Sequence, residues 1–200
     1  MIGNIYLCDM RDFKDKMIRL GLCNKWKRLW HNSYSQLDIL NMGLSMEGIE
    51  FLTKHSNDIS NNDILSLCGD YINNGYCVSP NQPHLSVSAY VSYKGDIKDY
   101  KADILYIKDS NAIIYNDDWK VLQLYVSGNS NVKLILSINN IVNINIFDNS
   151  NITIMGDMKT DNNKVTAFVY GDGGIKSFIS DKSNNINVIN NAILNKEKDR

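Results

Sequence analysis

Apolar positions change their spacing once along this chain, near residue 80. From residue 9 to about residue 74 they recur every three or four residues, which is typical of amphipathic helices. From Leu85 to Ser92 they alternate with polar residues, which is typical of a half-buried strand. The pattern therefore predicts a helical head over residues 1–78 and a β-repeat domain over residues 79–200.

The helical head divides into short segments at recognisable caps. Ser35, Ser45 and Ser60 each precede an apolar periodic run, where a serine hydroxyl can accept a hydrogen bond from a first-turn N–H group. Asp63 completes a capping box with Ser60. The first two predicted helices cover residues 9–20 and 24–31, and the next two follow Ser35 and Ser45. The fifth predicted helix follows Ser60, carries Ile72 on its apolar face and ends at Gly75.

The β-repeat domain has an internal period of about 20 residues. Ser-Asn pairs recur in polar turns at 110–111, 130–131 and 150–151, with alternating apolar residues on both sides. The apolar pairs that precede the three turns are Ile104 and Tyr106, Leu124 and Val126, and Ile144 and Ile146. Continuing the period places Val165, Ala167 and Val169 in the next copy, while Lys94 to Asp96 is expected to form a turn.

A fixed period of two short strands and two polar turns is the signature of a β-solenoid. An antiparallel sandwich of hairpins also fits strands that recur about every ten residues, but Ser-Asn pairs that stay in phase three times favour the solenoid. The predicted fold class is α+β: a small N-terminal helical domain followed by a short parallel β-solenoid of about four coils, about 20 residues each. Its open lateral face predicts self-association as a dimer or trimer.

The composition fits a stacked β architecture and excludes several classes of protein. The chain has 200 residues, with 28 Asn, 25 Ile and only 2 Pro, and rows of Asn and Ile suit stacked coils. A net charge of −1 gives no overall attraction to nucleic acid or to a membrane. The chain has no apolar run long enough for a membrane span, and its first residues lack the basic region of a secretory signal. We expect a cytoplasmic protein without membrane contact.

The four cysteines and three histidines do not predict a metal site. No CxxC pair occurs among them, and zinc sites usually need closely paired ligands. Calcium could lie between stacked acidic turns, but the glycine-aspartate nonapeptide for such a site is missing. We therefore expect no metal and no cofactor, and interpret the acidic positions as turn residues. These positions are Asp109, Asp148, Asp157, Asp161 and Asp172.

A basic and aromatic stretch runs from Arg11 to His31. Seven Lys and Arg residues stand there against two Asp, a local net charge of +5. Cations beside aromatic rings are typical of surfaces that bind phosphates and bases, whereas an amphipathic helix pair would bury the tryptophans and leave the lysines solvated. We expect this stretch to contact an anionic partner. The predicted binding residues are Lys25, Trp26, Lys27, Arg28, Trp30 and His31.

Trp119 is a second candidate for binding. It follows Asn116-Asp117-Asp118, at an expected edge of the solenoid, where it would either cover the apolar end of the stack or anchor a partner. No part of the sequence combines paired carboxylates with a base, a nucleophile elbow or an HExxH motif. We therefore expect a protein that is not an enzyme.

The head resembles the N-terminal module of small proteins carried by phages and mobile elements of gut Bacteroidales. The resemblance lies in Asp12 to Cys23, Trp26 and Trp30, Leu37 to Leu40, and Met46 to Leu52. In those proteins a helical module precedes a variable β-repeat tail rich in Asn, Ser and Tyr.

The resemblance implies a protein made inside an infected bacterial host cell. The function we expect is inhibition of a host defence system without catalysis. It would act either by binding a defence protein or by sequestering an anionic ligand such as a nucleotide or nucleic acid. The alternative is a structural component of the virion or tail, in which the solenoid oligomerises.

Overall fold

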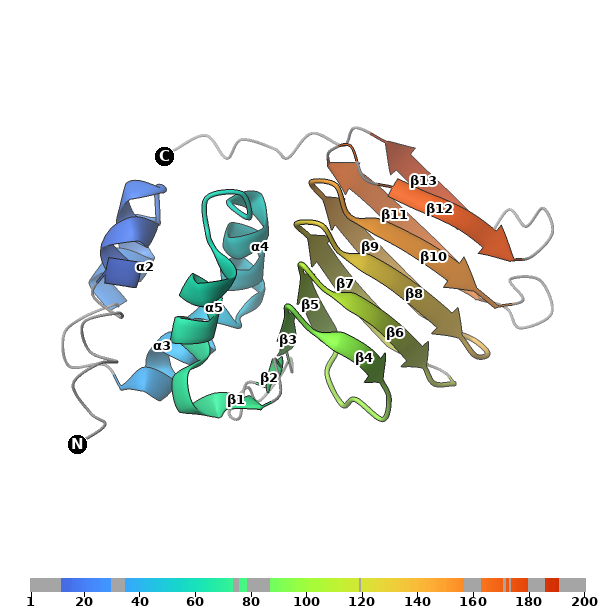
Figure 1. The fold of residues 1–200 in the computed structure, drawn as a ribbon, viewed down its shortest axis with the longest axis horizontal. Helices are drawn as coiled ribbons and strands as arrows, with labels where there is room; N and C mark the ends of the chain where they lie inside the picture. Colours follow the sequence, from blue (N-terminus) through green and yellow to red (C-terminus); the bar gives the residue numbers. More distant parts are fainter. Residues whose placement is uncertain are drawn as a thin grey trace.

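In the computed structural model, the chain forms an N-terminal helical head followed by a parallel β-solenoid of about four turns (Figure 1). This arrangement confirms the predicted α+β fold class. The structure describes residues 12–29, 35–73, 76–78, 87–118, 120–156, 163–170, 172, 174–179 and 186–190.

Short capped helices build the head, as the sequence predicts. Ser35, Ser45 and Ser60 are N-caps, and Ser35 and Ser60 form capping boxes with Asp38 and Asp63. A helix over residues 12–19 comes first and ends before Gly21, whose φ of +95° favours glycine. The helices that follow are α2 (Asn24–Leu29), α3 (Gln36–Gly43), α4 (Met46–Lys54) and α5 (Asn61–Cys68), and a 3-10 turn (Gly69–Tyr71) closes the head.

The last helix ends earlier than predicted. α5 stops at Cys68, because Gly69 adopts a φ of +51° and its N–H bonds to the carbonyl of Leu65. Ile72, predicted on the apolar face of this helix, instead begins strand β1 (Ile72–Asn73), while Gly75 lies outside the described residues. β1 pairs antiparallel with β2 (Tyr76–Val78), and β2 pairs antiparallel with the first strand of the solenoid. The sheet therefore begins before residue 80.

Parallel strands stack into two sheets that face each other (Figure 1). The larger sheet has the order β1-β2-β3-β5-β7-β9-β11-β13, and the smaller sheet has the order β12-β10-β8-β6-β4. All the strand pairs from β3 onward are parallel, as the solenoid prediction requires. The strands of the solenoid are β3 (Val87–Val91), β4 (Lys94–Ile97), β5 (Ile104–Lys108), β6 (Asn111–Asn116), β7 (Val121–Ser127), β8 (Asn131–Leu136), β9 (Ile141–Phe147), β10 (Asn151–Met155), β11 (Lys164–Tyr170), β12 (Gly174–Ile179) and β13 (Ile186–Asn190).

The register confirms the predicted period in the central coils and corrects it at both ends. Asn111 pairs with Asn131, and Asn131 with Asn151, so the three Ser-Asn turns are equivalent. The first coil is shorter than this period, because Lys94 already pairs with Asn111, and β4 occupies the segment predicted as a turn. The coil that leads to the fourth copy is longer than the period, because Val142 pairs with Val165.

In strands β5 to β11, apolar residues at every second position fill the interior of the solenoid. In β7 and β9, for example, Leu124 and Ile144 lie side by side and are fully buried. Stacking of like residues buries the face that one coil could not bury alone. The predicted inward positions Leu124, Val126, Ile144 and Ile146 are all part of this core.

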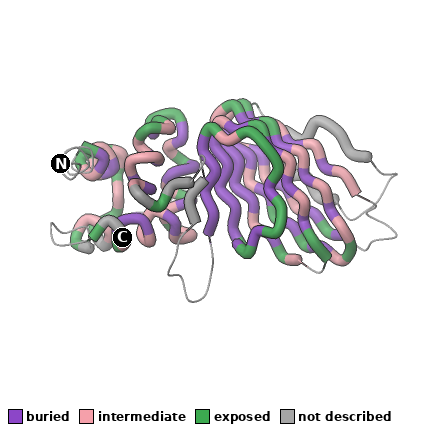
Figure 2. Tube along the Cα trace, turned by 60° about the horizontal axis from the view of Figure 1, so that its bottom comes forward, coloured by how far each residue is buried: buried purple, intermediate pink, exposed green. Residues whose placement is uncertain are grey.

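The head covers the outer face of the larger sheet, and this creates a second core. Ile104 and Tyr106, which the 20-residue period made equivalent to Leu124 and Val126, instead join this second core with Val87 and the apolar residues of the helices. β3 and β5 are consequently buried on both faces, so the prediction of a half-buried first strand is wrong. Figure 2 shows this difference: strands beside the head are buried along their length, and more distant strands alternate.

Candidate functional site

The structure places four of the seven predicted binding residues on one short helix. Lys25, Trp26, Lys27 and Arg28 all belong to α2, whereas Trp30, His31 and Trp119 lie outside the described residues. Arg28 is exposed, and Trp26 and Lys27 are half-buried. Figure 1 shows α2 at the end of the head away from the stacked strands, with α4 and α5 between them.

The turn between the first two helices holds α2 in place. The N–H of Leu22 donates to the carbonyl of Met17 (3.0 Å), and the N–H of Lys27 donates to the carbonyl of Cys23 (3.0 Å). Lys27 and Arg28 occupy the last turn of α2, where positive charge interacts favourably with the negative end of the helix dipole. Two of the predicted binding cations therefore also stabilise the helix to which they belong.

Trp26 ties α2 to the rest of the head. Its indole Nε1–H donates a hydrogen bond to the Glu47 carboxylate (3.0 Å), and Glu47 lies in the first turn of α4. An indole N–H that is partly removed from water needs such an acceptor. The sequence did not reveal this contact, because Glu47 belongs to a later helix and was noted only as part of a family resemblance.

Lys16 also has a structural role. Its Nζ donates to the Asp63 carboxylate (2.6 Å), which also accepts hydrogen bonds from the N–H and hydroxyl of Ser60. Burial favours the protonated form of Asp63, but the hydrogen bonds from Lys16 and Ser60 and the charge of Lys16 outweigh it. The pKa of Asp63 is therefore below its ordinary value. This ion pair joins the first helix to the start of α5.

Four other described cations of the basic stretch form no ion pair with any residue that the structure describes. Arg19 and Arg28 are exposed and Lys14 and Lys27 are half-buried. We call these four residues the cationic end of the head. Arg19 was not among the predicted binding residues, although it belongs to the same basic stretch of sequence.

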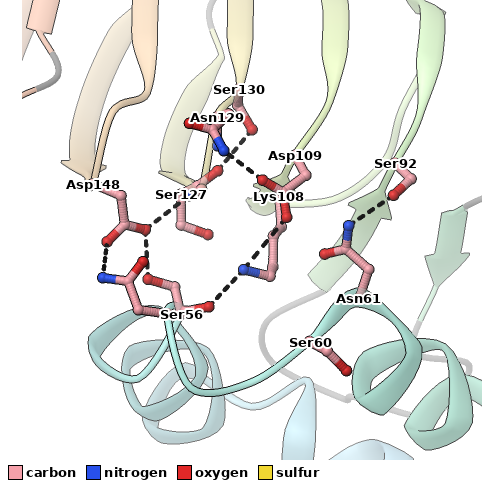
Figure 3. Close-up of polar contacts among 12 residues, drawn as sticks. Ser56, Ser60, Asn61, Ser92, Lys108, Asp109, Ser127, Asn129, Ser130 and Asp148 are labelled. Atoms are coloured by element: carbon pink, nitrogen blue, oxygen red, sulfur yellow. Dashed lines mark hydrogen bonds and ion pairs between the residues drawn. The ribbon is translucent and has the colours of Figure 1, made fainter.

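A second polar cluster lies where the head meets the solenoid, and sequence reasoning did not identify it (Figure 3). It contains Ser56 and Asn57 from the loop after α4, together with Lys108 at the end of β5, and Asp109 and Asp148 from the turns that follow β5 and β9. We call it the junction cluster. Lys108 is only 4% exposed, and its Nζ donates to the carbonyl of Ser56 (2.7 Å) and lies 3.6 Å from the Asp109 carboxylate.

Asp148 makes most of the contacts in the junction cluster. Its carboxylate accepts hydrogen bonds from the hydroxyl of Ser56 (2.5 Å), the side-chain amide of Asn57 (3.0 Å) and the N–H of Gly128 (2.8 Å). The two acidic turns Asp109 and Asp148 are thus used to fasten the head and the neighbouring turns. Asn61 adds a contact beside the cluster, because its Nδ2 donates to the hydroxyl of Ser92 (2.8 Å).

Glycine is required at position 128, between the two acidic residues. Gly128 has a φ of +70°, and a Cβ at this position would lie 2.1 Å from Oδ1 of Asp109. The same carboxylate oxygen accepts the N–H of Asn129 (2.8 Å). Asp109 therefore occupies the space left by the missing side chain and pairs with the next turn.

The turns at the opposite ends of the strands, on either side of position 119, are also polar. The Asp118 carboxylate accepts hydrogen bonds from the hydroxyl of Ser137 and from the backbone N–H of Ile138. The hydroxyl of Tyr100 donates to the side-chain oxygen of buried Asn116. Burial raises the pKa of Tyr100. Burial also lowers the pKa of Lys120, whose Nζ lies 3.5 Å from the centre of the Tyr100 ring. These contacts build the edge at which Trp119 was predicted to act.

Among the residues that the structure describes, no group of three or more His, Cys, Asp or Glu side chains could hold a metal ion. Nor does this part of the chain include a helix long and apolar enough to cross a membrane. The arrangement at the cationic end can attract and hydrogen-bond anions through Lys and Arg side chains. Comparisons of the chain with protein-family models, with curated proteins and with solved structures give no match.

Proposed function

We propose that this chain is a non-enzymatic binding protein that holds an anionic partner at the cationic end of its head. One observation carries the proposal: Lys16 and Lys108 pair with carboxylates inside the fold, whereas Lys14, Arg19, Lys27 and Arg28 do not pair with any described residue. The other side of the head already packs on the solenoid. Apart from the favourable position of Lys27 and Arg28 at the end of α2, these four charges form no ion pair that the described part of the fold uses.

The biological setting of this proposal rests on the resemblance to phage and mobile-element proteins. In that setting the partner is a host defence protein or an anionic ligand such as a nucleotide or nucleic acid, and binding inhibits defence. The protein would act in the cytoplasm of the infected bacterial cell. Arg and Lys side chains suit all of these partners, because both carry donors for carboxylates and phosphates.

The test compares two charge-reversed variants with the same change in net charge. Arg19→Glu with Arg28→Glu alters the cationic end, and Lys94→Glu with Lys164→Glu alters two exposed lysines of the solenoid. Each protein is used to capture partners from a bacterial host lysate, and native mass spectrometry records any small anion retained. We expect the first variant to lose its partner and the second to keep it. Equal capture by both variants would contradict the proposal.

A second candidate function is a structural part of a virion or tail. The observation that favours it is on the outer face of the smaller sheet, where Tyr115, Ile135 and Met155 are neighbours in one half-buried row. Such a row suits contact between copies in a larger assembly. Detection of the chain in purified particles, at a fixed ratio to a capsid protein, would favour this function over the first.

A further inference from the structure

We infer that the anionic partner of the cationic end is an acidic surface of another protein rather than a nucleic acid. The inference rests on the proposed function and narrows it to one class of partner. Three features of the described residues support it: the hydrogen bond that Trp26 makes to Glu47, the presence of both acidic and basic residues in the same helices, and the exposure of two arginines.

Trp26 is poorly placed to stack on a base. Single-stranded nucleic acids are held by aromatic rings whose faces are free, combined with cations that follow the phosphates. Here the indole nitrogen lies 3.0 Å from a carboxylate oxygen of Glu47, and the ring is half-buried against the head. A base stacked on Trp26 would bring its phosphate close to the negative charge of Glu47.

The charges around the cationic end are mixed in sign. Asp12 and Asp15 are exposed on the same helix as Lys14 and Arg19, with Asp15 one helical turn before Arg19, and exposed Glu47 contacts Trp26 of α2. A phosphate backbone is negative along its whole length, so each carboxylate opposes its binding. A protein surface can place acidic groups opposite the cations and basic groups opposite the carboxylates, and such complementarity sets specificity and register.

Arg19 and Arg28 are the most exposed cations of the site, and arginine suits a protein partner. The planar guanidinium binds a carboxylate through two parallel hydrogen bonds, which a lysine cannot do. Arginine and tryptophan are also enriched at the centres of protein–protein interfaces. A half-buried tryptophan and two exposed arginines give this part of the head the composition of a protein interface.

The experiment measures binding of two labelled probes, a glutamate-rich peptide and a thymidine single strand of matching charge, by fluorescence anisotropy at several salt concentrations. We expect the peptide to bind the wild type and to bind Arg19→Glu with Arg28→Glu at least about tenfold more weakly. Changing both arginines to lysine keeps the charge and should weaken peptide binding several-fold, because the paired hydrogen bonds are lost. Lys94→Glu with Lys164→Glu is the matched control and should bind the peptide like the wild type.

The outcomes separate this inference from the proposed function. Binding of the thymidine single strand that depends on Arg19 and Arg28 and falls steeply with salt would overturn the inference. The proposed function as an anion-binding protein would then still hold. Peptide binding that is as strong with both arginines changed to lysine as in the wild type would also overturn the inference, because charge alone would then suffice. If neither probe and no lysate partner depends on Arg19 and Arg28, both the inference and the proposed function are wrong. Circular dichroism melting of each variant confirms that it is folded before binding is compared.

Discussion

The backbone N–H of Ser110 donates a hydrogen bond to the hydroxyl oxygen of Ser130, which lies one coil further along the stack (3.1 Å). Ser130 repeats this contact with Ser150 (3.3 Å), and the N–H of Tyr93 makes it with Ser110 (3.0 Å). All three serines are buried. Each hydroxyl thus satisfies a buried backbone donor of the preceding coil, which would otherwise have no partner at the corner of the solenoid.

We predict that Ser130→Ala destabilises the protein by about 1–3 kcal/mol, because it leaves the buried N–H of Ser110 without an acceptor. Ser150→Ala should have a similar effect through the N–H of Ser130. Urea unfolding followed by circular dichroism measures both. Thr153→Ala removes a hydroxyl from the outer face of β10 and is the control. Equal costs for the control and the two serine variants would show that the ladder does not contribute.

The serine ladder also explains why the sequence predicted the solenoid. Ser110, Ser130 and Ser150 can serve as acceptors only if each coil places its serine at the same height and corner, so the period is kept constant at these positions. Parallel stacking follows from that repetition, since an antiparallel hairpin would not return to the same corner. The fold class was therefore visible in the spacing of one residue type.

The sequence did not show which side chains of β5 point into the solenoid. The reason is that the turn after β5 has one residue fewer than the turn after β7. Ile104 pairs with Gln123 and Leu105 with Leu124, which is one position short of the regular period that pairs Asn111 with Asn131. A shift of one residue moves every side chain of a strand to the opposite face. Apart from Lys108 at the end of the strand, both alternate sets of β5 residues are apolar, since each face meets a core, so hydrophobicity could not reveal the shift.

We predict that Tyr106→Ala costs about 3–5 kcal/mol of stability although Tyr106 lies on the outer face of its sheet, because the head buries it completely. Tyr115→Ala, on the outer face of the smaller sheet, should cost clearly less, because Tyr115 is only half-buried. Chemical denaturation of the two variants measures the difference. Similar costs would mean that the head does not cover the larger sheet in solution.

The junction cluster could not be predicted from the sequence either. Lys108 looks like an ordinary turn lysine, and Ser56 and Asn57 look like ordinary loop residues after α4. Their partners lie far away along the chain, and no spacing connects them. Only the docking of the head on the larger sheet brings these residues together.

We predict that Ser56 and Asp148 are energetically coupled across this junction. A double-mutant cycle with Ser56→Ala and Asp148→Asn should give a coupling energy on the order of 1–3 kcal/mol, because the hydroxyl donates to a charged carboxylate. Asparagine tolerates the φ of +57° at position 148, so the backbone is preserved. Ser56→Ala combined with Asp118→Asn, at the other end of the strands, should be additive. If the effects are additive in both cycles, the predicted coupling between Ser56 and Asp148 is wrong.

We predict an acid-dependent contribution from Asp63. The pKa of Asp63 is lower in the folded protein than in the unfolded chain, where it is about 3.9. Its ion pair and capping bonds therefore contribute fully to stability above the pKa of the unfolded chain. This contribution is lost as the pH falls through the lower pKa of the folded protein. Asp63→Asn should therefore lower the free energy of unfolding at pH 7, and its difference from the wild type should shrink in acid. Urea unfolding between pH 2 and about pH 7 tests this, with exposed Asp58→Asn as the control. A difference that stays constant with pH would contradict the assignment.

The sequence indicated where the candidate site lies in the chain but not which of its residues the fold itself uses. Charge counting over residues 11–31 identified the stretch that carries the cationic end, and the helical spacing placed Trp26 correctly on a short helix. The counting could not show that Lys16 and Trp26 are used by the fold, because their partners Asp63 and Glu47 come from later helices. The roles of Trp30, His31 and Trp119 stay predictions.

The final prediction concerns association through the outer face of the smaller sheet. Five strands about 4.8 Å apart and about six residues long give a flat face on the order of 400 Å², whereas a standard interface buries about 800 Å² on each partner. We therefore expect a weak dimer or trimer that forms at tens of micromolar and dissociates on dilution. Ile135→Lys places a charge in the middle of the apolar row formed with Tyr115 and Met155, and should give a monomer at every concentration. Light scattering across a dilution series measures the mass of both proteins, and a wild type that is monomeric at tens of micromolar would overturn the prediction.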